Sequence, residues 1–262
     1  MALITLATDF GTRDAFVGVM KGVIAERAPG VPVIDVTHGI PPQDVLAGAL
    51  VLQHAVPYFP PGTIHVGVVD PGVGSTRRPL CVETATAVLV GPDNGLLSLA
   101  APAEAVRRII HLTEERFFLA PRSQTFHGRD VFAPVAAALA TGTDPGALGR
   151  VVPDMARLTL PPVRTVGHRI RGEVIYIDGF GNLVTNVAET LLAGFPHAGV
   201  SITIGGARLR GIAACYAAIG PGDAVAVVNS WGLVEIAVRE GSARAELSAG
   251  VGTPVEIETP EP

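Results

Sequence analysis

Charged side chains and cysteines are both scarce in this 262-residue chain: charged residues make up 16% of it, and only two cysteines are present. The formal net charge of −5 provides no basic excess, which argues against nucleic acid or an anionic membrane surface as a partner. Cys81 and Cys215 fit no metal-ligand spacing and have apolar neighbours. We therefore predict that both are buried structural thiols.

Long hydrophobic runs and targeting segments are also missing. Gly, Pro or a charged residue breaks each apolar run before it reaches the length needed to span a bilayer. The opening "MALITLATDF" lacks the basic segment of a signal peptide and is typical of a strand. These features favour a soluble, cytoplasmic protein.

Several catalytic and cofactor motifs are absent as well. No GxGxxG follows the first predicted strand and no GxxxxGK[ST] occurs, so neither dinucleotide nor P-loop binding is indicated. The GxSxG nucleophile elbow and the HExxH, HxH and CxxC metal signatures are not found either.

The chain does contain enough apolar residues, 48%, to bury a large core. In residues 1–160, continuous apolar runs such as "LITLAT", "VPVIDVT" and "TIHVGVV" alternate with helical patterns, which predicts an α/β domain with a mainly parallel sheet. The segment "PPQDVLAGALVLQHAVPYF" is predicted to be a helix with prolines at its start. In residues 161–262, short alternating runs between Gly-rich turns predict a smaller all-β domain, a barrel or a sandwich.

Polar residues gather where the predicted strands end, which is where ligands bind in open parallel sheets. Each has an ordinary structural explanation: Asp9 and Asp93 as turn carboxylates, Asp14 and Asp130 as helix N-caps, and His127 as a satisfied structural histidine. Their joint placement favours a functional site nevertheless. The residues collected in this way are Asp9, Asp14, Asp35, His38, Asp44, Asp70, Asp93, Asn94, His127, Arg129, Asp178, Asn182 and Ser230.

The segment "VVDPGVGSTRRP" is the most unusual of these strand ends. Asp70 is held between Val69 and Pro71, and Arg77 follows seven residues later. A two-metal hydrolase built from Asp9, Asp70, Asp93 and His127 is conceivable. Arg77 weakens that interpretation, because a cation beside a carboxylate–histidine pair competes with a metal for the same ligands.

The chain resembles S-adenosyl-L-methionine hydrolases (adenosine-forming), also called hydroxide adenosyltransferases, which are relatives of the adenosyl-fluoride and adenosyl-chloride synthases. The resemblance covers nearly the whole chain and implies hydrolysis of S-adenosylmethionine to adenosine and methionine, without a metal or another cofactor. It also implies a homotrimer with sites between subunits. The segments that carry it are "TDFGTRDAFVGVMKG", "VIDVTHGIPPQD", "YFPPGTIHVGVVDPGVGSTRRPL", "VGPDNGLL", "TFHGRDVFAPVAA", "IDGFGNLVTN" and "NSWGLVEIAVREGSA".

The resemblance also implies roles for individual residues. The family's catalytic aspartate, arginine and histidine match Asp70, Arg77 and His127. Substrate contacts match Asp9 for the ribose, Asn182, Phe180 and the backbone near Val238 for the adenine, and Asp178, Ser230 and Asp14 for the methionine end, with Glu235 a further contact. Phe180 has an alternative as a core residue.

The chain differs from the halogenating relatives at three of its matched positions. Those relatives carry a tyrosine at the position of Asp70, a halide-binding serine at that of Gly128 and a tryptophan at that of Gln43. They also have an additional loop in the N-terminal domain. These differences favour water as the nucleophile.

The reaction fits these residue types. The sulfonium sulfur leaves C5′ as a neutral thioether, so the site needs to position and activate only a water, and water has a pKa of about 15.7. A guanidinium can stabilise developing hydroxide, while a carboxylate can fix the water or the histidine tautomer. A non-catalytic adenosyl-ligand sensor and a metal-dependent hydrolase of a nucleoside substrate remain as alternatives.

Overall fold

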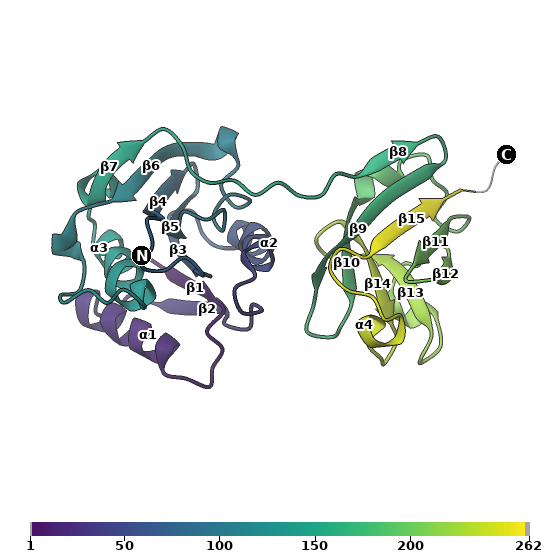
Figure 1. Ribbon diagram of the computed structural model, residues 1–262, viewed down its shortest axis with the longest axis horizontal. Helices are drawn as coiled ribbons and strands as arrows, with labels where there is room; N and C mark the ends of the chain where they lie inside the picture. The colour runs from purple at the N-terminus through teal and green to yellow at the C-terminus, as the bar shows by residue number, and fades with distance from the viewer. Residues whose placement is uncertain (1, 260–262) are drawn as a thin grey trace. The chain divides into compact units, whose positions relative to one another are not determined.

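The structure is a computed structural model that describes residues 2–259. The chain divides between Leu158 and Thr159 into two compact units, each with a sheet of its own (Figure 1). Within the described residues no helix is long and apolar enough to cross a membrane.

The first unit is an α/β structure around a seven-stranded sheet in the order β2-β1-β3-β5-β4-β6-β7. The first four strands in this order run parallel, and the other three are antiparallel to their neighbours. The predicted α/β class is confirmed, with a sheet that is mixed. The strands are β1 (Ile4–Thr8), β2 (Val33–Thr37), β3 (Thr63–Val68), β4 (Pro79–Thr84), β5 (Ala87–Pro92), β6 (Val106–Leu112) and β7 (Gly149–Val152).

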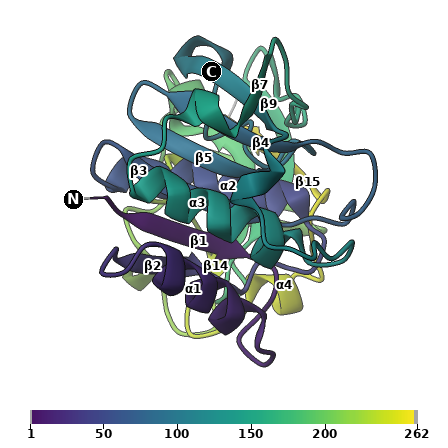
Figure 2. The same cartoon turned by 90° about the vertical axis from the view of Figure 1, so that its left-hand side faces the viewer.

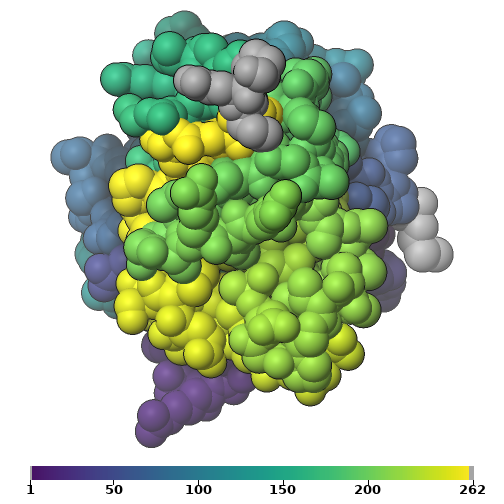
Figure 3. Space-filling model, turned by 90° about the vertical axis from the view of Figure 1, so that its right-hand side faces the viewer, coloured from purple at the N-terminus to yellow at the C-terminus, as the bar shows by residue number. Residues whose placement is uncertain are grey.

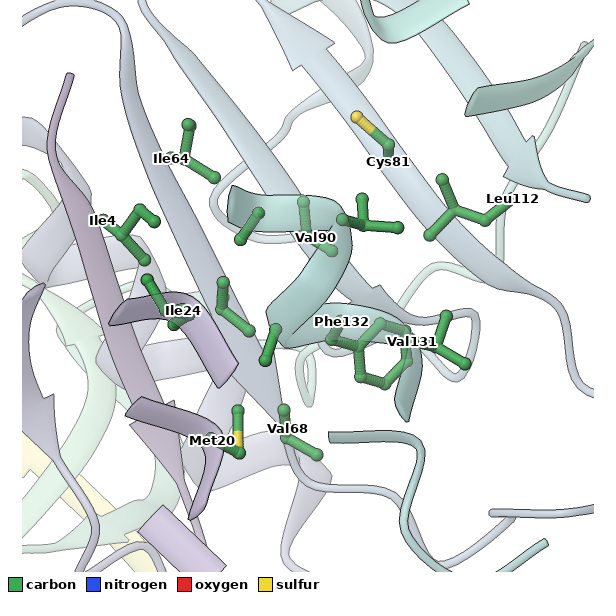
Figure 4. Close-up of a cluster of buried hydrophobic side chains, with 14 of the residues drawn as sticks. Ile4, Met20, Ile24, Ile64, Val68, Cys81, Val90, Leu112, Val131 and Phe132 are labelled. Carbon is green, nitrogen blue, oxygen red and sulfur yellow. The ribbon is translucent and has the colours of Figure 1, made fainter. Parts of the chain in front are cut away.

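Helices cover both faces of this sheet. Helices α1 (Phe16–Arg27) and α3 (Ala133–Ala140) pack side by side on one face, and α2 (Val45–Ala55) lies on the other (Figure 2). Beneath α1 and α3 the core is fully apolar, with Ile4, Met20 and Phe132 each 0% exposed (Figure 4). Burial on both faces explains why β1 and β3 are mostly apolar. Their buried polar residues include Thr5 and His65, whose Oγ1 and Nδ1 atoms lie 2.8 Å apart.

The start of α2 differs from the prediction. The side chain of Asp44 accepts a hydrogen bond of 2.9 Å from the Ala47 backbone N–H, so Asp44 is the N-cap and the helix begins at Val45. The prolines at 41 and 42 precede the cap and lie outside the first turn. An aspartate at this position satisfies one of the orphan N–H groups of the helix, which proline cannot do.

The second unit is all β, as predicted, and its eight strands pair antiparallel in the order β12-β11-β15-β9-β10-β14-β13, with β8 added to β9. Strand β15, in the yellow part of the chain, pairs with β9 and β11, so the last described strand packs among earlier segments of the unit (Figure 3). The elements are β8 (Arg164–Val166), β9 (Arg169–Ile177), β10 (Leu183–Ala188), β11 (Ser201–Ile204), β12 (Ala207–Arg210), β13 (Ala224–Val228), β14 (Leu233–Val238), the short helix α4 (Ala243–Glu246) and β15 (Pro254–Glu258).

Candidate functional site

The loop after β3 is built to hold Asp70 in place. The Val73 N–H donates to the Asp70 carbonyl at 3.1 Å, and the Ser75 N–H donates to the Gly72 carbonyl at 3.1 Å. Gly74 has a φ of +78°, and a Cβ added there would lie 2.3 Å from the Gln124 carbonyl oxygen. Only glycine therefore allows this loop to approach the segment that leads into His127.

Asp70, Arg77 and His127 form one buried cluster, with Arg77 at its centre. Arg77 Nε donates to Asp70 Oδ1 at 2.8 Å, and Arg77 Nη2 donates to Asp70 Oδ2. The same Nη2 lies 2.9 Å from His127 Nδ1. The guanidinium also lies over the Phe132 ring, 5.4 Å from its centroid. Arginine provides the planar fork that this bidentate pairing requires.

The contact with Arg77 determines which tautomer His127 adopts. Because a guanidinium only donates, His127 Nδ1 accepts from it, and the proton of the neutral ring is on Nε2. Burial, followed by the charge of Arg77, lowers the pKa of His127 below its ordinary value of 6.5. The ring is therefore neutral at neutral pH, and Asp70 acts on it through Arg77.

Two nitrogen atoms of the cluster are buried without a hydrogen-bond partner among the described residues: Arg77 Nη1 and His127 Nε2. Both are N–H donors in the protonation states just described. A buried donor without a partner costs roughly 1–3 kcal/mol, so a pair of them on adjoining side chains marks a place for an acceptor. A water or hydroxide oxygen is an acceptor of suitable size.

The other strand-end carboxylates of this unit have different partners. Asp9 Oδ2 accepts from the Gln43 backbone N–H at 2.8 Å, and Gln43 adopts a φ of +65°. Asp93 accepts from Arg78 Nε at 2.6 Å and from the Ala156 N–H at 2.7 Å. Across residues 2–259, no three His, Cys, Asp or Glu side chains are grouped in a way that could hold a metal ion.

Asp35 and His38 form a separate cluster. Asp35 Oδ2 accepts from Lys21 Nζ at 2.6 Å, while Asp35 Oδ1 is 3.0 Å from His38 Nε2. His38 Nδ1 is 2.9 Å from the Thr8 hydroxyl. These contacts connect β2 to β1 and α1, which indicates a structural role for the pair.

The capping roles suggested for Asp14 and Asp130 are wrong. Asp14 is exposed, and the N-cap of α1 is Ala15, without a side-chain cap. Asp130 is 1% exposed, accepts from the Ser123 N–H at 2.7 Å and pairs with the guanidinium of Arg129. It therefore braces the loop ahead of His127.

Gly128 follows His127 directly and is in close contact with its surroundings. A Cβ at Gly128 would lie 3.1 Å from the Met20 sulfur and 3.2 Å from the Phe126 ring. A side chain at this position would have to displace packed neighbours. Gly128 also begins the π-helical turn 128–132 that leads into α3.

In the second unit, Asp178 and Asn182 share a tight turn after β9. Asp178 Oδ1 accepts from the backbone N–H groups of Phe180 and Asn182, both at 2.9 Å, and its Oδ2 accepts from Asn182 Nδ2 at 2.9 Å. Phe180 lies between them in the chain and is 81% exposed. The alternative of Phe180 as a core residue is therefore wrong: the turn projects it into solvent.

Two cavities adjoin this turn, and together they are lined by all of the site residues predicted in this unit. A cavity of about 480 Å³ is lined by Asp178, Ser230 and Glu235, and one of about 710 Å³ is lined by Asp178, Phe180, Asn182 and Val238. Tyr216 borders both cavities. Apolar walls with a few polar groups are typical of small-molecule sites.

The lining residues that the sequence interpretation missed include Tyr216, Asn229 and Trp231. The Tyr216 hydroxyl donates to Glu235 Oε1 at 2.7 Å, and Asn229 Nδ2 donates to Glu235 Oε2 at 3.0 Å. Trp231 lies 5.1 Å from the Tyr176 ring, measured between centroids. Trp231 is the single tryptophan of the chain and adjoins Ser230, which was a signal available in the sequence.

The prediction for the cysteines is half right. Cys81 is fully buried on β4, and burial raises the pKa of its thiol to about 12. Cys215 is exposed and lines the 480 Å³ cavity. Its apolar neighbours belong to a loop between β12 and β13 and not to a core segment.

Comparison with known proteins gives the same family for both units. The family model for the SAM hydroxide adenosyltransferase N-terminal domain matches residues 4–149, and that for the C-terminal domain matches residues 172–256. The (R)-S-adenosyl-L-methionine hydrolase of Thermus thermophilus is 41% identical over 95% of this chain and 97% of its own. A fluorinase from an Actinoplanes species is 27% identical over 72% of each chain. A crystal structure of an uncharacterized conserved protein from Thermotoga maritima superposes with a TM-score of 0.90 at 33% identity, covering 98% of this chain and 99% of that one.

Proposed function

The chain belongs to the SAM hydroxide adenosyltransferase family, and from this premise we propose that it hydrolyses S-adenosyl-L-methionine to adenosine and L-methionine. The observation that carries the mechanism is the pair of buried donors without partners, Arg77 Nη1 and His127 Nε2. They are suited to hold a water oxygen for attack on C5′ of the substrate.

The reaction requires little besides this water. As its oxygen bonds to C5′, the C5′–S bond breaks, and the sulfur keeps the electron pair and leaves as the neutral thioether of methionine. One proton passes from the water to solvent, and the oxygen becomes the 5′-hydroxyl of adenosine. No acid is needed at the leaving group, and we propose that no metal or other cofactor takes part.

The cluster acts on the developing charge of the water. Two N–H donors, one of them on a guanidinium, favour hydroxide over water at this position, which makes the bound oxygen a better nucleophile for C5′. Asp70 holds the guanidinium by two hydrogen bonds, and Arg77 holds the ring of His127. In this mechanism His127 is a donor to the water, because its Nδ1 is already occupied.

The remaining residues are proposed to bind the substrate. Asp9 keeps one oxygen besides the one bonded to Gln43 and accepts from a ribose hydroxyl. The 710 Å³ cavity takes the adenine through Asn182, Phe180 and the backbone near Val238. The 480 Å³ cavity takes the methionine end through Asp178, Ser230 and Glu235, with Asp14 as a further contact.

We also propose a homotrimer, the assembly that the family resemblance implies. The water-holding cluster belongs to one unit and the two cavities to the other, and subunits that pair them between neighbouring chains complete the sites. A cytoplasmic location is proposed with it, since the substrate is a metabolite of the cell interior.

Hydrolysis in H₂¹⁸O tests the proposed function. Attack of water on C5′ places one ¹⁸O in adenosine and none in methionine, and mass spectrometry of both products distinguishes this from attack on the methionine side chain. Label in methionine or homoserine, or no adenosine at all, contradicts the proposal. Arg77→Lys should abolish most of the formation of labelled adenosine. Arg78→Lys is the matched control, because it alters a neighbouring arginine that pairs with Asp93 and Asp154.

A further inference from the structure

The ionisable side chains that line the 480 Å³ cavity include acidic residues and no basic ones among the described residues. Two carboxylates line it, Asp178 and Glu235, while no lysine or arginine does so among the described residues. A ligand that fills this cavity therefore meets two anionic groups and no cation of the same unit.

Glu235 has no ionic partner among the described residues. It is 3% exposed, and its two oxygens accept from the Tyr216 hydroxyl and from Asn229 Nδ2, both of which are neutral groups. Burial, followed by the hydrogen bond to Glu235, raises the pKa of Tyr216, so that hydroxyl stays protonated as a donor. The nearby Asp178 is likewise held by neutral N–H groups.

The basic side chain of the adjoining cavity does not offset this charge. Arg239 lines the 710 Å³ cavity, where its Nη1 donates to the Ile219 carbonyl at 2.5 Å and its Nε lies 3.7 Å from Glu240. Its guanidinium is thus already engaged within its own strand end and the loop before β13.

We infer that this cavity recognises the ammonium group of the substrate and makes no ionic contact with its α-carboxylate, so that the enzyme also hydrolyses decarboxylated S-adenosylmethionine. The inference rests on the proposed function, because it uses the same water and the same bond. Water oxygen bonds to C5′, the C5′–S bond breaks, and the electron pair stays on sulfur. The products are adenosine, 3-(methylthio)propylamine and one proton.

The magnitudes separate this inference from ordinary carboxylate recognition. A charge-assisted hydrogen bond to a carboxylate contributes about 1.5–3 kcal/mol, which is about 10–150-fold in kcat/KM. We expect decarboxylated S-adenosylmethionine to be turned over with a kcat/KM no more than about tenfold below that of S-adenosylmethionine. The analogue that keeps the carboxylate but lacks the amine should lose at least about tenfold.

The experiment measures adenosine formation from these three compounds under the same conditions. Asp178→Asn replaces a carboxylate with a neutral amide. It should shift the ratio of kcat/KM for S-adenosylmethionine to kcat/KM for the decarboxylated compound in favour of S-adenosylmethionine. Glu189→Gln, which alters an exposed carboxylate outside both cavities, should leave the ratio unchanged.

The two proposals fail in different ways. Absence of adenosine from S-adenosylmethionine itself would refute the proposed function. Normal turnover of S-adenosylmethionine with a loss of about 100-fold or more for the decarboxylated compound leaves that function standing and overturns the inference, because it reveals a cation, supplied by another chain, on the carboxylate. Full activity on the compound without the amine overturns it as well.

Discussion

Replacing Arg77 with lysine tests the centre of the proposed mechanism. Lysine keeps the positive charge but has one nitrogen, whereas Arg77 uses Nε and Nη2 for Asp70, Nη2 again for His127, and keeps Nη1 for the water. A single ammonium cannot occupy all of these positions at once. The water therefore loses a donor, or Asp70 and His127 lose theirs.

The structure sets the expected size of both effects. Loss of a donor that holds the water and favours its hydroxide form should lower kcat by about 10²–10⁴-fold, the range found for a positioned acid–base group. The side chains of Arg77 and Asp70 are only 8% and 4% exposed, so a carboxylate oxygen left without its partner costs about 1–3 kcal/mol of unfolding free energy. For a domain of this size that lowers Tm by roughly 2–12 °C.

Single-turnover kinetics and calorimetry measure these two quantities, with substrate affinity determined separately. Arg78→Lys is the control, because that side chain is 30% exposed and pairs with Asp93 and the exposed Asp154, and we expect it to retain activity within about threefold. Near-normal turnover by Arg77→Lys would refute the role of the fork. So would a loss of activity explained entirely by weaker substrate binding, since the cluster is proposed to act on the transition state.

Four further predictions follow from the site. The rate should be constant above the ordinary histidine pKa of about 6.5 and fall only below it. Burial and Arg77 lower the pKa of His127, and a second proton on the ring would face the guanidinium. A pH–rate profile checks this, and a rise in rate on acidification contradicts it. Asp9→Ala should weaken adenosine binding in calorimetry more than it slows the chemical step, and unchanged affinity would remove Asp9 from the ribose site. Activity should survive EDTA, whereas loss on chelation with rescue by a divalent ion would support a metal-dependent hydrolase. Light scattering should give the mass of a trimer, and a fully active monomer would exclude shared sites.

Local chemistry made part of this structure predictable. The strand ends that carry Asp9, Asp70 and Asp93 could be located because buried parallel strands are continuous apolar runs. The α/β and all-β classes followed from the same patterns. Short strands such as β7, β8 and β12 were not predicted, because three or four partly exposed residues carry no clear period.

Contacts between distant segments could not be predicted from the sequence. That Asp70 acts on His127 through Arg77 depends on how the loop after β3 meets residue 127, some fifty positions later. The bond from Tyr216 to Glu235 similarly depends on the packing of a loop against β14. The exposure of Cys215 and Phe180 depends on turns whose apolar neighbours resemble those of a core segment.

The close approach at Gly74 gives this enzyme an unusual route to inactivity. A single methyl group added there would collide with the Gln124 carbonyl and push apart the two loops that bring Arg77 to His127. The sequence would still contain every polar residue of the cluster and every residue that lines the two cavities of the second unit. A lineage could therefore turn such a hydrolase into a protein that only binds its nucleoside ligand by one small substitution, and a comparison of catalytic residues alone would not detect the change.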